Sequence, residues 1–255
     1  MNDAERPLAL SVDEVTKVFG GAQPTTALSR ASLRVAEGEF VCLLGRSGCG
    51  KSTLLSMIAG LIRPTSGTID TRGNRVGMMF QDANLFSWLT VAGNIELALR
   101  LSGVPRRDWP TRVAELLEIV QLPDARDKRP HELSGGMRQR VALARSLAQE
   151  CRILLMDEPF AALDALTRDG MHEEIERIWS ERGITVVFVT HNVREAARLG
   201  DRVVIMSPSP GRIVDEVRID LPRPRRMEDA AVAAQSGRLH ELMDRHDLVA
   251  ERIAS

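Results

Sequence analysis

The 255-residue sequence lacks several features that would place a protein in a special class. It has no run approaching the ~20 apolar residues that a helix needs to cross a bilayer. Its first ten residues, MNDAERPLAL, lack the basic start and the apolar run of a secretory signal peptide. We therefore expect the chain to be made in the cytosol and to stay there.

An excess of charge of one sign is also missing. The formal net charge is -1, so no overall basic field recruits nucleic acid or an anionic bilayer, and we expect no nucleic-acid partner. Lysine occurs only at Lys17, Lys51 and Lys128. Because lysine is so scarce, a lysine inside a glycine-rich loop is a more specific signal of a phosphate-binding motif.

Cysteine is sparse and carries no metal-type spacing. Cys42, Cys49 and Cys151 include no CxxC pair and fall in or beside apolar runs and a glycine-rich loop, so we expect reduced, structural thiols. The hydrophobic content of 44% is enough for one large core, or for one core with a modest insertion.

Apolar periodicity predicts an α/β fold. Leu8–Phe19 and Leu28–Val35 alternate apolar and polar residues, as half-buried antiparallel strands do. Further strands are expected from Glu39, Ser66 and Arg75, and over Ile153–Met156, Ile184–Thr190, Arg202–Ser207 and Arg212–Val217. Helices are expected over Lys51–Leu61 and Val91–Leu101, on the stripe Val113, Leu116, Leu117, Val120, and on the face of Met171, Ile175 and Ile178. Their alternation predicts a parallel sheet with helices on both sides.

The same pattern predicts three parts. Residues 1–81 and 151–220 form the α/β core with a small β subdomain, and residues 82–150 form a helical subdomain. Residues 221–255 form a charged, helical tail that begins with the linker LPRPRR.

The segment GRSGCGKST has the spacing of a phosphate-binding loop between a strand and a helix. Its glycines let backbone N–H groups turn towards phosphate oxygens, and the following helix start adds its positive dipole end. We expect Lys51 to bridge the β- and γ-phosphates and Ser52 to ligate Mg²⁺. The nucleotide-binding residues are Gly45, Arg46, Ser47, Gly48, Cys49, Gly50, Lys51, Ser52 and Thr53.

A second nucleotide motif, ILLMDE, places two carboxylates at the end of an apolar strand. Ligands of parallel sheets bind at this edge. We expect Asp157 to hold Mg²⁺ and Glu158 to act as the general base on the attacking water.

Three single residues gain meaning from this context. Gln81 ends a strand and enters the helical part, so it is a candidate to touch the Mg²⁺ or the water. His191 follows the strand ITVVFVT, where an imidazole orients water and bonds the γ-phosphate. Phe19 closes the first strand and is either a platform for adenine or an ordinary core residue.

The segment LSGGMRQR, at Leu133–Arg140, lies between the two nucleotide motifs. It resembles the signature of the ABC transporter ATPases, and ILLMDEPF, AALDALTR and VTHNVREA follow in that family's order. The resemblance implies a RecA-like P-loop core with an antiparallel β subdomain and an inserted helical subdomain. It also implies that Ser134, Gly135 and Gly136 bind the γ-phosphate of a partner copy's ATP and that Asp164 crosses the dimer interface.

A physical argument supports the second copy. A helix start after LSGG offers N–H groups to an anion, yet Gly136 lies far along a separate lobe from its own phosphate loop. Two-fold symmetry would create two composite sites. We therefore expect each ATP to lie between two copies of the chain.

Within the family, FQDANLFSWLTVAGNI and DRVVIMSPSPGRI are most similar to ATPases of nitrate, sulfonate and taurine importers. This implies a transmembrane permease, a periplasmic solute-binding protein and a peripheral location on the cytoplasmic face of the bacterial inner membrane. Ser87 and Asn192 depart from the usual pattern. Both departures leave the ATP chemistry intact.

The segment Asn84–Val91 is expected to receive a cytoplasmic helix of the permease in a groove. Leu85, Phe86, Trp88 and Leu89 would supply the apolar floor, unless they pack inside the helical subdomain.

Other classes of protein remain to be weighed against an importer subunit. These are an ABC ATPase of another importer type, a soluble ABC clamp on chromosomes or ribosomes, and a simple P-loop kinase or GTPase. The clamps need a long coiled coil or two cassettes, and the sequence has neither. A kinase or GTPase would not need LSGG.

Overall fold

The computed structural model describes residues 6–21, 23–208 and 210–254. Two predictions fall partly outside these residues: that residues 1–5 do not begin a leader, and that the helical tail extends to Ser255. The chain forms two compact units, Met1–Gly73 with Thr185–Ser255, and Asn74–Ile184. The division into three parts remains a prediction. In the described part of the chain, no helix combines the length and apolar character that a membrane span requires.

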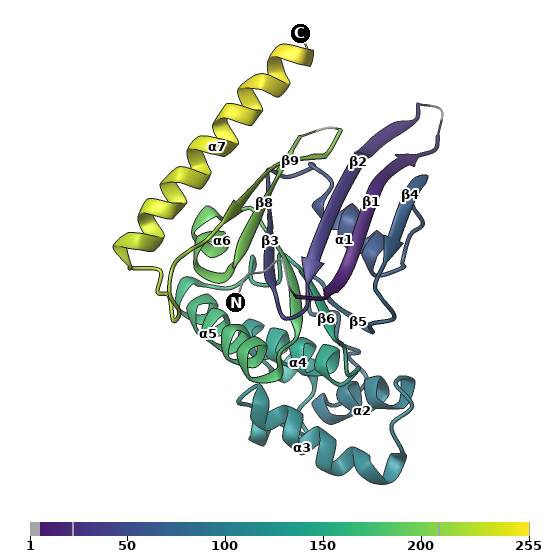
Figure 1. The fold of residues 1–255 in the computed structure, drawn as a ribbon. Helices are drawn as coiled ribbons and strands as arrows, with labels where there is room; N and C mark the ends of the chain where they lie inside the picture. Colours follow the sequence, from purple (N-terminus) through teal and green to yellow (C-terminus); the bar gives the residue numbers. More distant parts are fainter. Residues whose placement is uncertain (1–5, 22, 209, 255) are drawn as a thin grey trace. The chain divides into compact units, whose positions relative to one another are not determined.

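The first unit begins with a three-stranded antiparallel layer. β1 (Leu8–Phe19) lies between β2 (Thr25–Ala36) and β4 (Ser66–Asp70) (Figure 1). Buried and exposed residues alternate along most of β2, as expected for a strand with one face on the core. The two predicted strands of this β layer are therefore confirmed.

The same unit contains a mostly parallel set of strands. β3 (Phe40–Leu44) is flanked by β7 (Thr185–Thr190) and β8 (Arg202–Ser207), and both pairings are parallel. β9 (Arg212–Arg218) adds to β8 in the antiparallel sense. Every residue of β3 and β7 is buried, and this explains why their sequences are continuous apolar runs.

In the described part of the first unit, three α-helices are present: α1 (Lys51–Ile58), α6 (Val193–Leu199) and α7 (Ala230–Ala254). α1 ends three residues before the predicted Leu61, because the chain turns through Gly60 at φ +73. α7 packs on α6 and β8 and forms most of the predicted tail.

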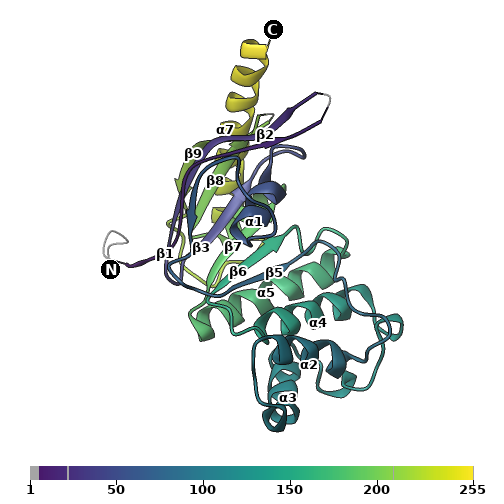
Figure 2. The same cartoon turned by 90° about the vertical axis from the view of Figure 1, so that its right-hand side faces the viewer.

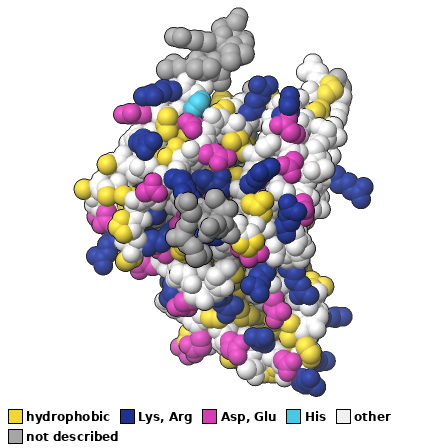
Figure 3. Space-filling view, viewed as in Figure 1, with side chains coloured by type: hydrophobic (Ala, Val, Ile, Leu, Met, Phe, Trp, Pro, Cys, Tyr) yellow, Lys and Arg dark blue, Asp and Glu magenta, His cyan; other side chains and the backbone are white. Residues whose placement is uncertain are grey.

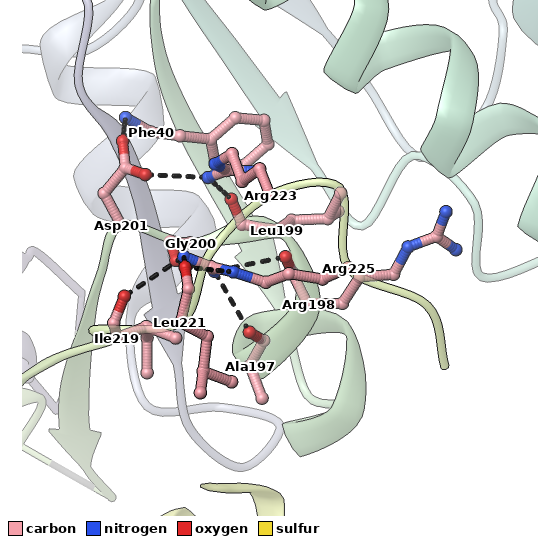
Figure 4. Close-up of polar contacts among 10 residues, drawn as sticks. All are labelled: Phe40, Ala197, Arg198, Leu199, Gly200, Asp201, Ile219, Leu221, Arg223 and Arg225. Carbon is pink, nitrogen blue, oxygen red and sulfur yellow. Dashed lines mark hydrogen bonds and ion pairs between the residues drawn. The ribbon is translucent and has the colours of Figure 1, made fainter. Parts of the chain in front are cut away.

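Two arginines anchor the linker that precedes α7 (Figure 4). The buried guanidinium of Arg225 donates to the backbone carbonyls of Ala197, Arg198, Gly200, Ile219 and Leu221. Arg223 donates to the Leu199 carbonyl and to Asp201. Positive charge at the carboxyl end of a helix satisfies its last carbonyl groups. The LPRPRR segment is thus fixed to the end of α6.

The second unit combines two parallel strands with four helices. β5 (Val76–Met79) pairs with β6 (Ile153–Asp157). Figure 2 shows α2, α3 and α4 grouped together, and all three contact one another. Met171, Ile175 and Ile178 are fully buried, as predicted for one face of α5. The four helices are α2 (Val91–Leu101), α3 (Trp109–Ile119), α4 (Gly135–Leu147) and α5 (Ala165–Arg182).

All three cysteines are free thiols buried in the protein, as predicted. Burial raises the pKa of the Cys151 thiol to about 11 and raises that of Cys42 further. On the face shown in Figure 3, basic and acidic side chains are interspersed.

Candidate nucleotide site and docking groove

In the first unit, parallel pairing brings two predicted site segments together. Leu44, the last residue of β3, is in register with Thr190, the last residue of β7. The phosphate loop from Gly45 and the residue His191 therefore leave neighbouring strand ends at the same edge. This is the edge where parallel sheets bind ligands.

The phosphate loop wraps around the side chain of Lys51. Its Nζ atom donates to the carbonyl oxygens of Gly45 at 2.6 Å and Arg46 at 3.0 Å, and it lies 3.7 Å from the Cys49 Sγ atom. Lys51 is buried. A buried ammonium held only by neutral groups is a strong anion attractor, since a phosphate would supply the missing negative charge.

The loop ends at Gly50, which precedes α1. Gly50 has φ +87, and a Cβ atom there would lie 2.8 Å from the carbonyl oxygen of Ala27 in β2. Glycine has no side chain to cap the helix, so the N–H groups of the first turn of α1, including those of Ser52 and Thr53, are oriented for an anion.

Phe19 lies at the same side of this unit. It ends β1 in register with Thr25, two residues before the Ala27 that contacts Gly50. Its side chain is 44% exposed, so it is not a core residue. The Nζ atom of Lys17 lies 5.1 Å from the ring centroid. Stacking of this ring on adenine remains a prediction.

In the second unit, β5 and β6 bring another set of predicted residues together. Met79, the last residue of β5, is in register with Met156, so Gln81 comes two residues after one strand end, while Asp157 ends the neighbouring strand and Glu158 follows it. Glu158 has φ +43. A non-glycine residue in this left-handed region carries backbone strain on the order of 1 kcal/mol, and such strain clusters at functional positions.

The available oxygen donors fit Mg²⁺. In the second unit Asp157 offers a carboxylate and Gln81 an amide oxygen, and in the first unit Ser52 offers a hydroxyl. Each is a hard ligand of the kind that this ion takes alongside water and substrate phosphates. Among the described residues no group of three or more His, Cys, Asp or Glu side chains could hold a metal. Ligation of Mg²⁺ by Ser52, Gln81 and Asp157 remains a prediction.

The signature segment starts a helix in the second unit. Ser134 is the N-cap of α4 and its Oγ atom accepts from the backbone N–H of Met137 at 3.3 Å. Gly135 and Gly136 form the first turn. A Cβ atom on Gly136 would lie 2.3 Å from the Thr167 side chain, so α4 and α5 start side by side.

Asp164 is the N-cap of the neighbouring α5. It accepts a hydrogen bond of 3.0 Å from the backbone N–H of Thr167. Hydrogen bonds from Thr167 hold the pKa of this exposed carboxyl below its usual value. The structure thus groups Asp164 with the signature residues in one unit, as it groups Gln81 with Asp157 and Glu158.

A groove of about 500 Å³ lies elsewhere in the second unit. Of the four apolar residues expected to form a docking floor, only Phe86 lines it; Trp88 is 69% exposed and touches the Phe86 ring. Leu85 and Leu89 are half-buried. The groove is lined by Met78, Phe80, Asn84, Phe86, Asn94, Leu97, Ala98, Leu101, Ser102, Arg145 and Gln149.

A buried amide shapes the loop beside this groove, and the four-residue docking floor remains a prediction. The Asn94 side chain accepts from the N–H of Phe86 and donates to the carbonyls of Phe86 and Thr90. These bonds fasten the loop to the start of α2, where Leu89 packs beside Gly93. The α2 face takes the place of the missing loop residues.

Sequence reasoning missed two residues of α4. The Nε2 atom of Gln139 donates to the carbonyl of Gln81 at 2.6 Å. Arg145 donates to the carbonyls of Asn84 and Ala83 at 2.6 Å and 2.9 Å. Their partners are backbone atoms more than 55 residues away in the chain, so no spacing pattern within α4 reveals them.

Comparisons with known proteins agree with this arrangement. Residues 28–161 match the family model described as ABC transporter. The chain is 46% identical over 200 residues to the taurine import ATP-binding protein of Jannaschia sp., covering 76% of this chain and 75% of that protein. It is 46% identical over 239 residues to the aliphatic sulfonates import ATP-binding protein of Rhodopseudomonas palustris, covering 92% and 83%.

A solved structure is also similar. The dimeric, post-hydrolysis ATP-binding cassette MJ0796 bound to ADP and Pi superposes with a TM-score of 0.73 at 33% identity, covering 84% of this chain and all of that one. The strand-end motifs, the signature at the start of α4 and these likenesses together show a RecA-like P-loop fold, and the chain belongs to the ABC transporter family as one of its ATPase subunits.

Proposed function

We propose that this chain is the ATP-hydrolysing subunit of an importer that carries nitrate, a sulfonate, taurine or a related small solute. Two copies close around two ATP molecules and drive a separate transmembrane permease at the cytoplasmic face of the bacterial inner membrane. A periplasmic solute-binding protein delivers the solute. The names of the taurine and sulfonate relatives support this class of transporter.

The residues of the first unit bind the nucleotide. Lys51 exchanges the carbonyl oxygens of Gly45 and Arg46 for the β- and γ-phosphates, which compensate its charge fully. The loop N–H groups hold the remaining phosphate oxygens, and Ser52 contributes its hydroxyl to Mg²⁺. Phe19 stacks on the adenine.

The residues at the strand ends carry the hydrolysis. Asp157 and Gln81 hold Mg²⁺, which neutralises charge on the β- and γ-phosphates when bound. Glu158 accepts the proton of the attacking water as general base, and His191 orients that water and the γ-phosphate. The strained backbone of Glu158 fixes the carboxylate at the strand end.

One observation carries the shared-site mechanism. The starts of α4 and α5 lie side by side, so Ser134, Gly135 and Gly136 form an anion-binding surface with Asp164 beside it. This surface has no base and no phosphate loop of its own. The dimeric state of the MJ0796 cassette supports its completion by a second copy.

A mixing experiment tests the mechanism. Lys51→Ala breaks the phosphate loop and Ser134→Arg breaks the signature, so each variant alone should be inactive. A dimer with one copy of each variant has both defects in one composite site and an intact second site. An equal mixture should then recover about one quarter of wild-type activity, from half the dimers with half their sites. No recovery, in copies shown to associate, contradicts shared sites.

The groove beside Phe86 supports a membrane partner. Its apolar wall and its exposed rim, Phe80 and Leu101, fit an amphipathic helix from the permease. Co-purification of the tagged subunit from native membranes identifies the permease. The solute that stimulates ATP hydrolysis in that complex then identifies the cargo.

A further inference from the structure

α7 is attached to the first unit unevenly along its length. Val232, Ser236 and Leu239 are buried where the helix packs on α6 and β8 (Figure 1). Leu242 and Met243 follow Leu239 by three and four residues and so continue the same helix face, but they are only half-buried. The apolar attachment is therefore firm up to Leu239 and weak beyond it.

Polar contacts hold the second half of the helix. One carboxylate oxygen of Asp244 lies 3.9 Å from the guanidinium of Arg46, and the other lies 3.7 Å from the Nε2 atom of His240. The Nε2 atom of His246 lies 3.4 Å from a carboxylate oxygen of Asp215 in β9. The side chains of Arg46 and Asp244 are at least half exposed, and ion pairs of this kind contribute little free energy. This part of the helix can therefore leave the core at small cost.

Arg46 connects α7 to the nucleotide site. It is the second residue of the phosphate loop, and its backbone carbonyl accepts from the Nζ atom of Lys51 at 3.0 Å. Phosphates that draw Lys51 away from this carbonyl also bring negative charge to the loop that carries the Arg46 guanidinium. They compete for that guanidinium and repel the Asp244 carboxylate beside it. Nucleotide binding therefore weakens the hold of the loop on α7.

We propose that the second half of α7 is an arm that responds to bound nucleotide. Without nucleotide, Asp244 holds residues 240–246 against the phosphate loop. Nucleotide phosphates displace Asp244 from Arg46 and loosen these residues, while the helix stays docked up to Leu239. Because coupling is reciprocal in free energy, Asp244 also lowers the affinity of the loop for nucleotide. The inference goes beyond the proposed importer function, since it concerns one subunit and its nucleotide alone.

A matched pair of variants tests the effect of Asp244 on nucleotide affinity. Asp244→Asn removes the carboxylate that contacts Arg46. Glu241→Gln removes an exposed carboxylate three residues earlier, so both variants change the net charge equally. The probe is ADP with Mg²⁺, and its dissociation constant is measured by isothermal titration at low salt.

Asp244→Asn should tighten ADP binding about two- to fivefold, the range expected for an exposed charge pair, whereas Glu241→Gln should change it less than about 1.5-fold. In about 1 M salt, where the Debye length falls to about 3 Å, the difference between the two variants should disappear.

The reciprocal effect is measured in the unaltered chain. Saturating ADP should speed backbone hydrogen exchange over residues 240–246 at least about twofold, while exchange over residues 232–239 stays the same. In Asp244→Asn the contact with Arg46 is already absent, so ADP should no longer change exchange over residues 240–246. Circular dichroism of both variants without nucleotide checks that they are folded.

Two kinds of failure are distinct. Equal effects of Asp244→Asn and Glu241→Gln on ADP affinity, or exchange over residues 240–246 that ADP slows or leaves unchanged, would overturn the arm. Neither result bears on the importer function, since neither measurement involves the second copy or the permease. Absence of ADP binding by the unaltered chain would instead contradict the proposed nucleotide site.

Discussion

The phosphate loop offers a test in which two glycines differ in one respect. Gly48 and Gly50 have nearly the same backbone conformation, with φ +84 and φ +87. A Cβ atom on Gly48 would meet nothing within 4 Å, whereas one on Gly50 would lie 2.8 Å from the Ala27 carbonyl oxygen and 2.7 Å from Leu28. Substitution by alanine therefore separates backbone strain from steric overlap.

The expected magnitudes follow from these two terms. Alanine in the left-handed region costs about 1–2 kcal/mol, and its restriction of the unfolded chain offsets about 0.4–1 kcal/mol. Gly48→Ala should lower the free energy of unfolding by about 1 kcal/mol. Gly50→Ala adds about 1–3 kcal/mol for overlap with backbone that cannot rotate away, for a total of about 2–4 kcal/mol.

The assay is calorimetric thermal unfolding of the nucleotide-free protein at a fixed scan rate. At about 2–4 °C per kcal/mol for a chain of this size, Gly48→Ala should lower Tm by about 2–4 °C. Gly50→Ala should lower it at least twice as far. Equal decreases for the two variants, or a larger decrease for Gly48→Ala, would refute the claim that packing of the loop on β2 requires glycine at position 50.

Three further outcomes are expected. Glu158→Gln should bind ATP and accumulate as a dimer on size exclusion with little hydrolysis, since it lacks the general base; a monomer in saturating ATP would count against the mechanism. Asn94→Ala should lower the free energy of unfolding by about 1–3 kcal/mol, because it leaves the backbone N–H of Phe86 without its acceptor, whereas the carbonyls of Phe86 and Thr90 keep the N–H groups of Leu89 and of residue 94, and should speed hydrogen exchange at Phe86; unchanged exchange would disprove the anchoring role. With its pKa raised to about 11, Cys151 is almost entirely protonated at pH 8, so iodoacetamide should label it only above about pH 10 or after unfolding, and rapid labelling of the native protein at pH 8 would contradict its burial.

The elements were predictable wherever burial leaves a local pattern. β3 and β7 are covered on both faces and therefore read as unbroken apolar runs, while β2 alternates because one face is solvated. α2 has the predicted bounds Val91–Leu101, and the structure shows that the Thr90 side chain caps its start by accepting from the Gly93 N–H. The end of α1 was placed three residues too late, because a glycine-led turn can begin before the apolar residues stop.

The nucleotide motifs were predictable for the same reason. Each one occupies a strand end or a helix start, where chain direction alone determines which way the backbone groups face. The parallel register of β3 with β7 then accounts for Gly45 and His191 leaving neighbouring strand ends, and that of β5 with β6 does the same for Gln81 and the Asp157–Glu158 pair. The sequence left two roles open for Phe19, an adenine platform and a core residue. Its exposure depends on how far β1 extends past its neighbouring strands, and no local sequence pattern reports that length.

The groove beside Phe86 was harder to predict, because tertiary hydrogen bonds decide its shape. Asn94 fastens the Phe86–Thr90 loop to α2, so Phe86 and Leu89 are half-buried while Trp88 stays exposed. Three of the four expected floor residues are replaced by residues of α2, β5 and α4. A polar residue in an amphipathic helix gives no local sign of which distant backbone it will bind.

One helix links the chemistry to the groove. α4 carries Ser134 at its start, donates through Gln139 to the Gln81 carbonyl, and donates through Arg145 to the carbonyls of Ala83 and Asn84. A rigid helix moves as a body, so a force on the signature residues reaches the segment after Gln81 through two fixed points rather than through a flexible loop. Occupation of the groove beside Arg145 acts on the same segment from its other end. Because coupling between sites is reciprocal in free energy, the proposed function predicts that a partner bound in this groove and a phosphate bound at Ser134 each alter the affinity for the other wherever this helix has two positions.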